Sequence, residues 1–250
     1  MPEGVVFMPK TEVIIGLCVI ALILFGIIVF IHMNKSKEPL SSEWTKQDEK
    51  FMIRLPEPDR MGSEPLETVI KKRRSIRNYS DESLSLKDLS QLLWAGQGIT
   101  DETYGFRSTP SAGALYPLEL LVAVGAVDEL TPGIYRYVPQ SHGLQQISKG
   151  DPRDSLCQAA LDQKAICEAP VSLVVTAVPN RTTKKYGSRG IQYVHIEVGH
   201  AGQNITLQAT ALDLGSVVIG AFSNKGVAAV LGLTGEEEAY YIIPVGHKIE

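Results

Sequence analysis

From about residue 60 to the end of the chain, stretches with the apolar spacing of a helix alternate with short apolar runs. We expect helices over 65–74, 85–96, 193–214 and 226–231. Ser85 and Asp88 have the spacing of a capping box, which indicates a helix start. Gly96 and Gly215 mark expected helix ends, because glycine readily adopts the left-handed conformation that closes a helix.

The short apolar runs are typical of buried strands. We expect strands over 118–124, 134–138, 144–147, 171–178 and 241–245. The second and third of these flank His142-Gly143, which fits the turn of a hairpin. Strands mixed with helices predict an α+β fold, in which helices flank a central mixed or antiparallel sheet.

The N-terminal part has a different pattern. Val13 to Ile31 is an uncharged, apolar run of 19 residues, and about 20 are needed to cross a bilayer. We therefore expect a short tail over 1–12, a single transmembrane anchor over 13–33, a tether over 34–60 and one folded domain over 61–250. The alternative is a cleaved signal peptide, whose apolar region is usually shorter, at about 7–15 residues.

The orientation of the anchor follows from its flanking charges. Lys35 and Lys37 follow the apolar run, and only Lys10 precedes it. Because lysine and arginine favour the cytoplasmic side of a membrane, we expect a single-pass membrane protein with a cytoplasmic catalytic domain.

Basic residues are concentrated in one place. Five of the seven residues from Lys71 to Arg77 are basic, although the chain has 24 Lys and Arg against 28 Asp and Glu. Without these five, 19 basic residues remain against 28 acidic ones, a formal charge of −9. Such a cluster on an acidic body indicates one local anion, such as a cofactor phosphate, rather than a nucleic-acid surface. The open alternatives are a helix end that favours cations and docking on anionic lipid or RNA.

The cysteines and histidines do not predict a metal site. Cys18, Cys157 and Cys167 lack the spacing of metal ligands or of a disulfide framework. We expect three small buried thiols, which suits a reducing compartment. His195 and His200 are five apart on one expected helix, so they point about 140° apart and do not easily share a metal.

Several separated blocks of sequence resemble one known family. The blocks are Leu55 to Pro58, Arg73 to Arg77, Leu93 to Thr100, Pro110 to Pro117, Lys185 to Gly190, Glu197 to His200 with Gln203-Asn204, and Pro244 to Gly246. With them the chain resembles the nitroreductase superfamily of flavoproteins and, within it, the SagB/ThcOx-type dehydrogenase branch. The resemblance covers about Leu55 to His247.

The resemblance implies a nitroreductase-like FMN fold with the flavin at the interface of a homodimer. The cofactor-binding residues would be Arg73, Arg74, Ser75, Arg77, Ser111, Ala112, Gly113, Ile219, Gly220 and Lys248. Arg73 and Ser75 would bind the FMN phosphate, and Arg77 would approach the N1/O2 edge of the ring. The N–H of Gly220 would lie near N5. The loop with Ser111–Gly113 would pass from one subunit against the flavin of the other, where small residues permit close approach.

Two positions depart from the family pattern. Ile219 stands where many nitroreductases have an acidic residue. Many members also place a basic phosphate ligand after the Pro-Val-Gly turn, where this chain has only His247 and Lys248. We therefore expect phosphate binding to depend more strongly on the Arg73–Arg77 cluster.

Lys185 and Tyr186 are the candidate catalytic residues. Azoline-oxidising members of the branch use a Lys-Tyr pair in proton removal as a hydride passes to FMN. A lysine that is desolvated in a cleft can serve as a base. The alternative is a surface lysine beside a half-buried tyrosine in a loop, where Lys184 adds to a solvated basic turn.

These features together predict a membrane-anchored, FMN-dependent oxidoreductase that transfers hydride by a ping-pong mechanism. The substrate would be a small or peptide-derived heterocycle that is dehydrogenated, or a nitro or quinone compound that is reduced. The alternative from another class is a non-catalytic flavin-fold receptor or scaffold at the membrane.

Overall fold

The computed structural model describes residue 24 and residues 52–249 of the chain. The predicted tail over 1–12, the anchor over 13–33 except Leu24, and most of the tether lie outside the described residues. No helix within the described part is long and apolar enough to cross a membrane.

A seven-stranded sheet forms the centre of the domain, with the strand order β1-β6-β5-β4-β7-β9-β8. All neighbouring strands are antiparallel. The strands are β1 (Met52–Arg54), β4 (Leu118–Val124), β5 (Gly133–Val138), β6 (Gly143–Lys149), β7 (Val171–Ala177), β8 (Leu214–Ser216) and β9 (Glu238–His247). A small separate hairpin consists of β2 (Ile99–Asp101) and β3 (Phe106–Arg107). The α+β class and the five expected strands are confirmed.

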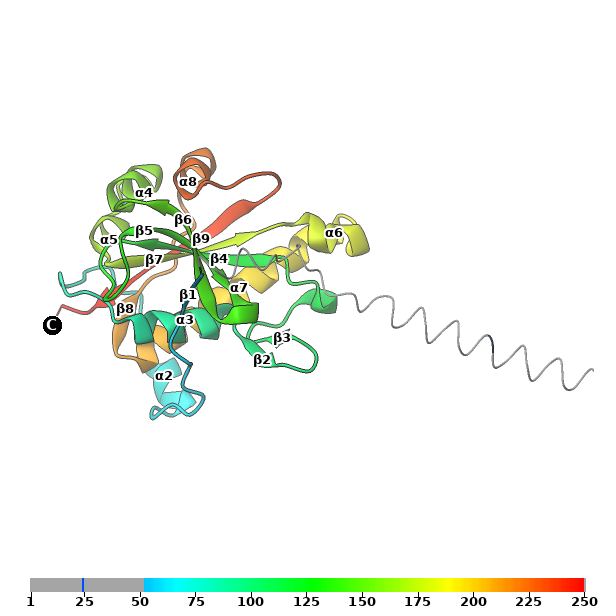
Figure 1. Cartoon of the computed structure of the whole chain (residues 1–250), viewed down its shortest axis with the longest axis horizontal. Coiled ribbons are helices and arrows are strands. Elements are labelled where there is room, and N and C mark those ends of the chain that lie inside the picture. The colour runs from blue at the N-terminus through cyan, green and yellow to red at the C-terminus, as the bar shows by residue number, and fades with distance from the viewer. Residues whose placement is uncertain (1–23, 25–51, 250) are drawn as a thin grey trace, which may run out of the picture. The chain divides into compact units, whose positions relative to one another are not determined.

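Helices cover both faces of this sheet (Figure 1). They are α2 (Leu66–Lys72), α3 (Leu86–Gln97), α4 (Arg153–Ala159), α5 (Lys164–Glu168), α6 (Asn180–Tyr186), α7 (Arg189–Ala211) and α8 (Asn224–Leu231). α3 and α7 pack on one face, and α4, α5 and α8 pack on the other. Ser85 caps α3 as expected, since its hydroxyl accepts a hydrogen bond from the N–H of Asp88 at 3.0 Å.

The central strands are buried on both faces. In β4, Leu120 and Val122 join the core under α3 and α7, and Leu121 and Ala123 join the core under α4, α5 and α8. This division follows from the two-residue period of a strand. It also explains why these strands read as continuous apolar runs in the sequence, because a strand covered on both faces has no polar side.

The folded domain begins earlier than the expected residue 61. β1 pairs with β6, and Leu55 is buried in the core. The N–H of Asp59 donates to the side chain of Gln91 on α3 at 2.8 Å. Residues 52–60 of the expected tether are therefore packed against the domain. A three-residue strand and a proline-rich arm carry too little periodicity to be recognised in advance.

The long helix spans Arg189–Ala211 instead of 193–214. Its C-terminus precedes Asp213, whose φ of 59° is left-handed, and the expected end at Gly215 lies within β8. The unpredicted helix α6 comes before it, and Gly187 with a φ of 57° separates the two helices.

Cys157 and Cys167 form a disulfide bond that joins α4 to α5, so the expectation of free thiols is wrong for these two residues. The chain turns back between them at Leu161 and Asp162, which both have positive φ. This turn brings the two cysteines together although their spacing of ten residues is not diagnostic. Because disulfides persist in oxidising compartments, the thiol argument for a cytoplasmic domain no longer holds.

Candidate functional site

The basic segment lies along the edge of the sheet, next to β8. The N–H of Ile76 donates to the carbonyl of Ser216 at 2.9 Å, and Ser75 forms an isolated bridge with Ser216. Ile76 also packs on Gly215, where a Cβ would lie 2.8 Å from its methyl group. A larger residue at position 215 would therefore push the basic segment away from the sheet.

This segment presents alternate side chains on one side. Arg73, Ser75 and Arg77 are two residues apart, and such residues share a face of an extended chain. Ile76 lies between them and is half-buried, and the buried hydroxyl of Tyr79 donates to its carbonyl at 2.7 Å. The side chains of Arg73 and Arg77 form no hydrogen bond or ion pair with the residues that the structure describes. The arrangement therefore suits a single bound anion.

Two other predicted members of this group are already engaged. Arg74 donates from Nη1 to the carbonyls of Lys71 and Arg73, at 3.0 and 2.7 Å, and so closes the C-terminus of α2. Lys248 forms an ion pair with Asp213, and this lowers the pKa of the Asp213 carboxyl. The structure thus gives Arg74 a helix-capping role and offsets part of the charge on Lys248.

Ile219 and Gly220 follow the same edge of the sheet. Ile219 exchanges two backbone hydrogen bonds of 2.9 Å with Ile242 of β9, and its side chain is buried in the core. Neither its side chain nor its N–H is therefore free for a ligand. Gly220 is exposed, and its N–H has no backbone partner among the described residues. That N–H is therefore available as a donor, and its predicted place beside a flavin ring stays a prediction.

The second group of predicted residues forms a strained loop. Gly113, Ala114 and Tyr116 have φ values of 65°, 53° and 44°, a region that costs energy for residues other than glycine. Two hydrogen bonds hold the loop. The N–H of Tyr116 donates to the hydroxyl of Ser111 at 2.9 Å, and Arg181 donates to the carbonyl of Tyr116 at 3.1 Å. Strain of this kind persists where the surroundings enforce it, and it is often found at functional sites.

This loop lies directly against the candidate catalytic pair. A Cβ at Gly113 would lie 2.7 Å from Tyr186 Oη and 3.0 Å from Lys185 Nζ. Lys185 is exposed, and Tyr186 is half-buried with its ring edge-on to Tyr193 at 5.2 Å. Both belong to α6, so the alternative interpretation is wrong about a loop, but its exposed lysine beside a half-buried tyrosine is what the structure shows. The structure brings Gly113, Lys185 and Tyr186 together from separate segments.

Glu197 on α7 adjoins the same loop and was not predicted as a site residue. It is 2% exposed, and this burial raises its pKa to about 7, although Ser111, Arg107 and the N–H of Ala112 favour the charged form. Its Oε1 has no hydrogen-bond partner in the described part of the chain. A signal existed in the sequence, because Glu197 is three residues after the buried Val194 and so lies on the apolar stripe of the helix.

Further charged side chains support the loop. The guanidinium of Arg107 lies 4.7 Å from the centre of the Tyr116 ring, and it donates to Gln97 at 2.9 Å. Burial lowers the pKa of Arg107, and the nearby Glu119 opposes this shift. Glu119 also forms an ion pair with Arg181 at 2.5 Å. Contacts of Arg107 and Arg181 with Tyr116 therefore connect the loop to the neighbouring charged side chains.

The two groups of residues lie near opposite ends of α7 (Figure 1). The helix begins beside α6, where Gly190 packs on the backbone of Thr183, and it ends shortly before β8, which contacts Ser75. Its 23 residues span roughly 33 Å at about 1.5 Å per residue, which is longer than an FMN molecule. The length of α7 therefore separates the two groups within one chain.

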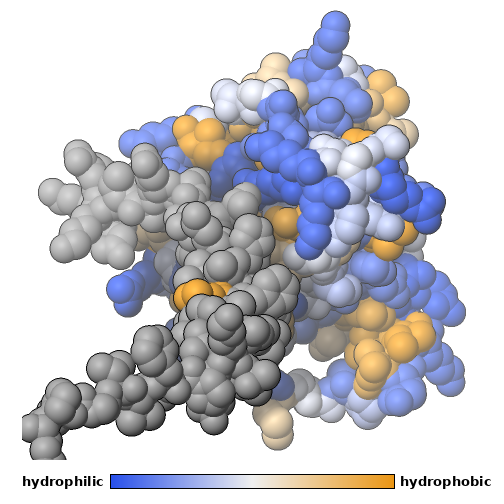
Figure 2. All heavy atoms as spheres, turned by 90° about the vertical axis from the view of Figure 1, so that its right-hand side faces the viewer, coloured by the Kyte–Doolittle hydropathy of each residue, from blue (hydrophilic) through white to orange (hydrophobic). Residues whose placement is uncertain are grey.

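The surface at the α6 end is mostly polar. Figure 2 shows this side of the molecule, and the described residues there are largely hydrophilic with small, separate hydrophobic groups. Lys184 and Lys185 are both exposed. Among the described residues, the surroundings of the candidate catalytic pair are therefore suited to a polar or charged molecule.

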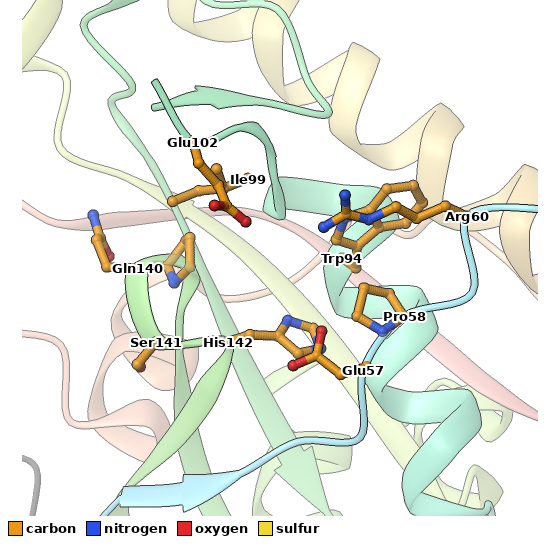
Figure 3. A pocket seen from close by; sticks show the side chains of 10 residues that line it. Glu57, Pro58, Arg60, Trp94, Ile99, Glu102, Gln140, Ser141 and His142 are labelled. Atoms are coloured by element: carbon orange, nitrogen blue, oxygen red, sulfur yellow. The ribbon is translucent and has the colours of Figure 1, made fainter. Parts of the chain in front are cut away.

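A cavity of about 240 Å³ lies elsewhere, between the proline-rich arm, the end of α3 and the turn before β6 (Figure 3). Its lining includes Arg60, Trp94 and His142, and none of its residues is a predicted site residue. His142 is engaged in the fold, since Nε2 lies 3.0 Å from the carbonyl of Pro56 and Nδ1 lies 2.9 Å from the hydroxyl of Tyr137. We interpret this cavity as the space left where the proline-rich segment before α2 packs against the rest of the domain.

The antiparallel sheet with helices on both of its faces is the arrangement of the nitroreductase fold. Comparison with protein families agrees, because the Nitroreductase family profile matches residues 70–247. The chain belongs to the nitroreductase family.

Individual relatives support this assignment. A protein of Methanocaldococcus jannaschii that is named a nitroreductase is 45% identical over 185 residues, which cover 74% of this chain and 92% of the relative. The microcin B17-processing protein McbC of Escherichia coli is 26% identical over 165 residues, covering 62% of this chain and 60% of McbC. A crystal structure from Ralstonia eutropha, described as a nitroreductase, has a TM-score of 0.69 at 26% identity and covers 85% of this chain and 98% of its own. The resemblance to the superfamily and its SagB-like branch is confirmed.

Proposed function

We propose that the protein is an FMN-dependent oxidoreductase that works as a homodimer, with each site built from both subunits. The observation that carries the proposal is the separation of the two half-sites by the length of α7. Arg73, Ser75 and Arg77 of one subunit would hold the phosphate and approach the ring edge. The Ser111–Gly113 loop and the Lys185-Tyr186 pair of the other subunit would close over the ring.

The residues present fit FMN in three respects. The guanidinium groups of Arg73 and Arg77 have no partner among the described residues, and they share one side of an extended segment. The N–H of the exposed Gly220 has no backbone partner in the described part of the chain, so it could donate to the ring. Ala112 and Gly113 have side chains small enough for close approach to a flat ring. When bound, FMN supplies the hydride chemistry, and the protein supplies position and charge.

Lys185 and Tyr186 would move the proton. Lys185 Nζ lies 5.4 Å from the centre of the Tyr186 ring, and both contact the position of Gly113. Packing of the partner subunit and substrate around the exposed Lys185 would exclude water from it, which would allow the lysine to act as a base.

The Lys185→Ala variant tests this role, and Lys184→Ala is a matched control because Lys184 is the exposed neighbour on the same helix. General-base catalysis contributes about 100-fold or more, so we expect Lys185→Ala to lose turnover by that factor and to retain flavin. Lys184→Ala should behave as wild type. Equal turnover of both variants on every accepted substrate would exclude Lys185 as the base.

For the substrate, we propose a small or peptide-derived heterocycle that is dehydrogenated. The Lys185-Tyr186 pair and the similarity to McbC, which is named for processing microcin B17, support this class. The second candidate is reduction of a quinone or nitro compound, since the predicted anchor would hold the enzyme where apolar quinones concentrate. A panel of azoline peptides, quinones and nitroaromatics separates the two classes.

The first experiment is the visible absorption spectrum of the full chain purified in detergent, followed by heat release of any chromophore. Oxidised-flavin bands, with FMN as the released species, would support the oxidoreductase. A colourless protein that stays colourless after addition of FMN would exclude it, and the non-catalytic receptor or scaffold would then be the better interpretation.

We also propose that residues 13–33 anchor the protein in a membrane. The lysines that follow this run favour a cytoplasmic domain, whereas the Cys157–Cys167 disulfide favours an oxidising compartment. Retention in carbonate-washed membranes tests the anchor. Protease treatment of intact cells tests the side, since a cytoplasmic domain would be protected.

A further inference from the structure

The Cys157–Cys167 disulfide has no part in the function proposed above, yet it lies close to a segment that does. It closes the turn between α4 and α5, and that turn is bonded to residues 221–223, which directly follow Gly220. We propose that this disulfide is a site of thiol–disulfide exchange with a dithiol reductant, and that its opening loosens the edge of the sheet that receives the flavin. The second half of the inference rests on the proposed function, because the place of Gly220 beside the ring belongs to it.

Hydrogen bonds connect the turn to this segment. The N–H of Ser223 donates to the carbonyl of Ala159 at 2.8 Å. Gln163 donates from Nε2 to the carbonyl of Ala221 at 2.7 Å, and the same group donates to a carbonyl within the turn at 2.8 Å. A displacement of the turn is therefore passed directly to the residues next to Gly220.

The turn itself depends on restraint. Leu161 and Asp162 have φ values of 63° and 55°, and this left-handed region is unfavourable for residues other than glycine. Both side chains are exposed, so packing contributes little to holding them. The restraint comes from backbone hydrogen bonds, such as that from the N–H of Asp162 to the carbonyl of Cys157 at 3.0 Å, and from the disulfide. Cutting the cross-link therefore permits the turn to relax, while α5 stays packed through the buried Ala165 and Ile166.

The exchange begins at the more accessible sulfur. Cys167 is half-buried and Cys157 is buried, so a thiolate of the reductant reaches Cys167 more easily. This thiolate forms an S–S bond with Cys167 and breaks the bond to Cys157, which leaves as a thiolate and takes up a proton. The second thiol of the reductant then attacks the mixed disulfide and releases Cys167 as a thiol. Two electrons pass to the protein, and the reductant ends as a disulfide.

The test uses the full chain in detergent with the substitution Cys18→Ser, so that Cys157 and Cys167 are its only cysteines. The oxidised form is compared with a form treated with dithiothreitol, which is removed before FMN is added under anaerobic conditions. Thiol titration reports whether the disulfide has opened. Amide hydrogen exchange of peptide 218–224 needs no flavin and includes the bonded N–H of Ser223. FMN affinity is measured from the change in flavin fluorescence on binding.

We expect dithiothreitol to release the thiols of both cysteines, to speed the exchange of peptide 218–224 and to weaken FMN binding by about fivefold, the effect of one hydrogen bond lost. Reoxidation should restore both properties. Gln163→Ala should speed the same exchange while the disulfide is intact, because it removes the bond to Ala221. Gln158→Ala is the matched control, since Gln158 is an exposed glutamine on α4, and it should leave the exchange unchanged.

Three outcomes would overturn the exchange site and its effect on the segment. They are the absence of new thiols after treatment, unchanged exchange of peptide 218–224 in the reduced form, and an equal rise of exchange in β4 and β7, which would indicate general unfolding. Faster exchange with unchanged FMN affinity would overturn the effect on the flavin. Absence of FMN binding in both forms would instead refute the proposed function, and the exchange measurement would still decide whether the disulfide holds the segment.

Discussion

Replacing Gly113 by alanine tests whether the strained loop sets the position of the candidate catalytic pair, Lys185 and Tyr186. Gly113 has a φ of 65°, and alanine in this conformation costs about 1–2 kcal/mol of unfolding free energy. The new Cβ would lie 2.7 Å from Tyr186 Oη, so the hydroxyl must retreat by roughly 0.7 Å to reach an ordinary contact of 3.4 Å. Because misplacement by about 1 Å can reduce turnover about 100-fold, we expect a loss of about tenfold or more.

Gly105→Ala is the matched control for this experiment. Gly105 has nearly the same φ, 68°, but nothing lies within 4 Å of its Cβ position. Urea unfolding should therefore show similar destabilisation of both variants. The atoms that the new Cβ displaces in Gly113→Ala are the ends of the Lys185 and Tyr186 side chains, and their movement adds little to the free-energy cost. Turnover, with the reductant and acceptor that wild type accepts, should fall only in Gly113→Ala. Equal turnover in the two variants would refute the positioning role of the loop.

Three further outcomes concern stability. Since the folded pKa of Glu197, about 7, lies above its ordinary 4.5, the folded state keeps a proton that the unfolded state loses. Wild-type stability should therefore fall by about 3 kcal/mol as the pH rises through this window, and urea unfolding of Glu197→Gln should lack that decline. Tyr79→Phe removes a buried hydroxyl that donates to the carbonyls of Ile76 and Pro244 at 2.7 and 3.2 Å, and it should cost about 1–2 kcal/mol in the same assay. Cys157→Ser opens the disulfide loop and should cost about 3 kcal/mol, but only under oxidising conditions; an equal loss with reductant present would contradict this origin.

The sequence was sufficient to predict the layers of the fold. The central strands appear in the sequence as continuous apolar runs. α3 appears as an apolar stripe that follows a capping residue. Both patterns depend only on residues close together in the sequence. α6 was missed because Asn180–Tyr186 is a short, polar segment without an apolar face, and such a helix is stabilised by packing on its neighbours. The Cys157–Cys167 pair was missed for a related reason, since the turn between them is visible only in three dimensions.

The candidate site was predicted as a set of residues but not as an arrangement. The resemblance indicated both Gly113 and the Lys185-Tyr186 pair, yet their contact depends on how α6 packs against a distant loop. Ile219 and Arg74 show the reverse case. The resemblance placed both at the cofactor, but backbone hydrogen bonds and burial engage Ile219 within the fold, and hydrogen bonds to nearby carbonyls engage Arg74. The burial of the Glu197 carboxyl likewise depends on tertiary packing. The sequence alone could have shown only that Glu197 lies on the apolar stripe of its helix.

If each site is shared between two subunits, as we propose, the separation of the two half-sites along α7 has a genetic consequence. In a twofold-symmetric dimer, a defect in Arg77 disables the half-site at one end of each chain, and a defect in Lys185 disables the half-site at the other end. A mixed dimer of these two defective chains contains one site with both defects and one site with neither. Random mixing of equal amounts should therefore restore about one quarter of the wild-type sites. Two inactive alleles would complement each other, although neither chain is active alone.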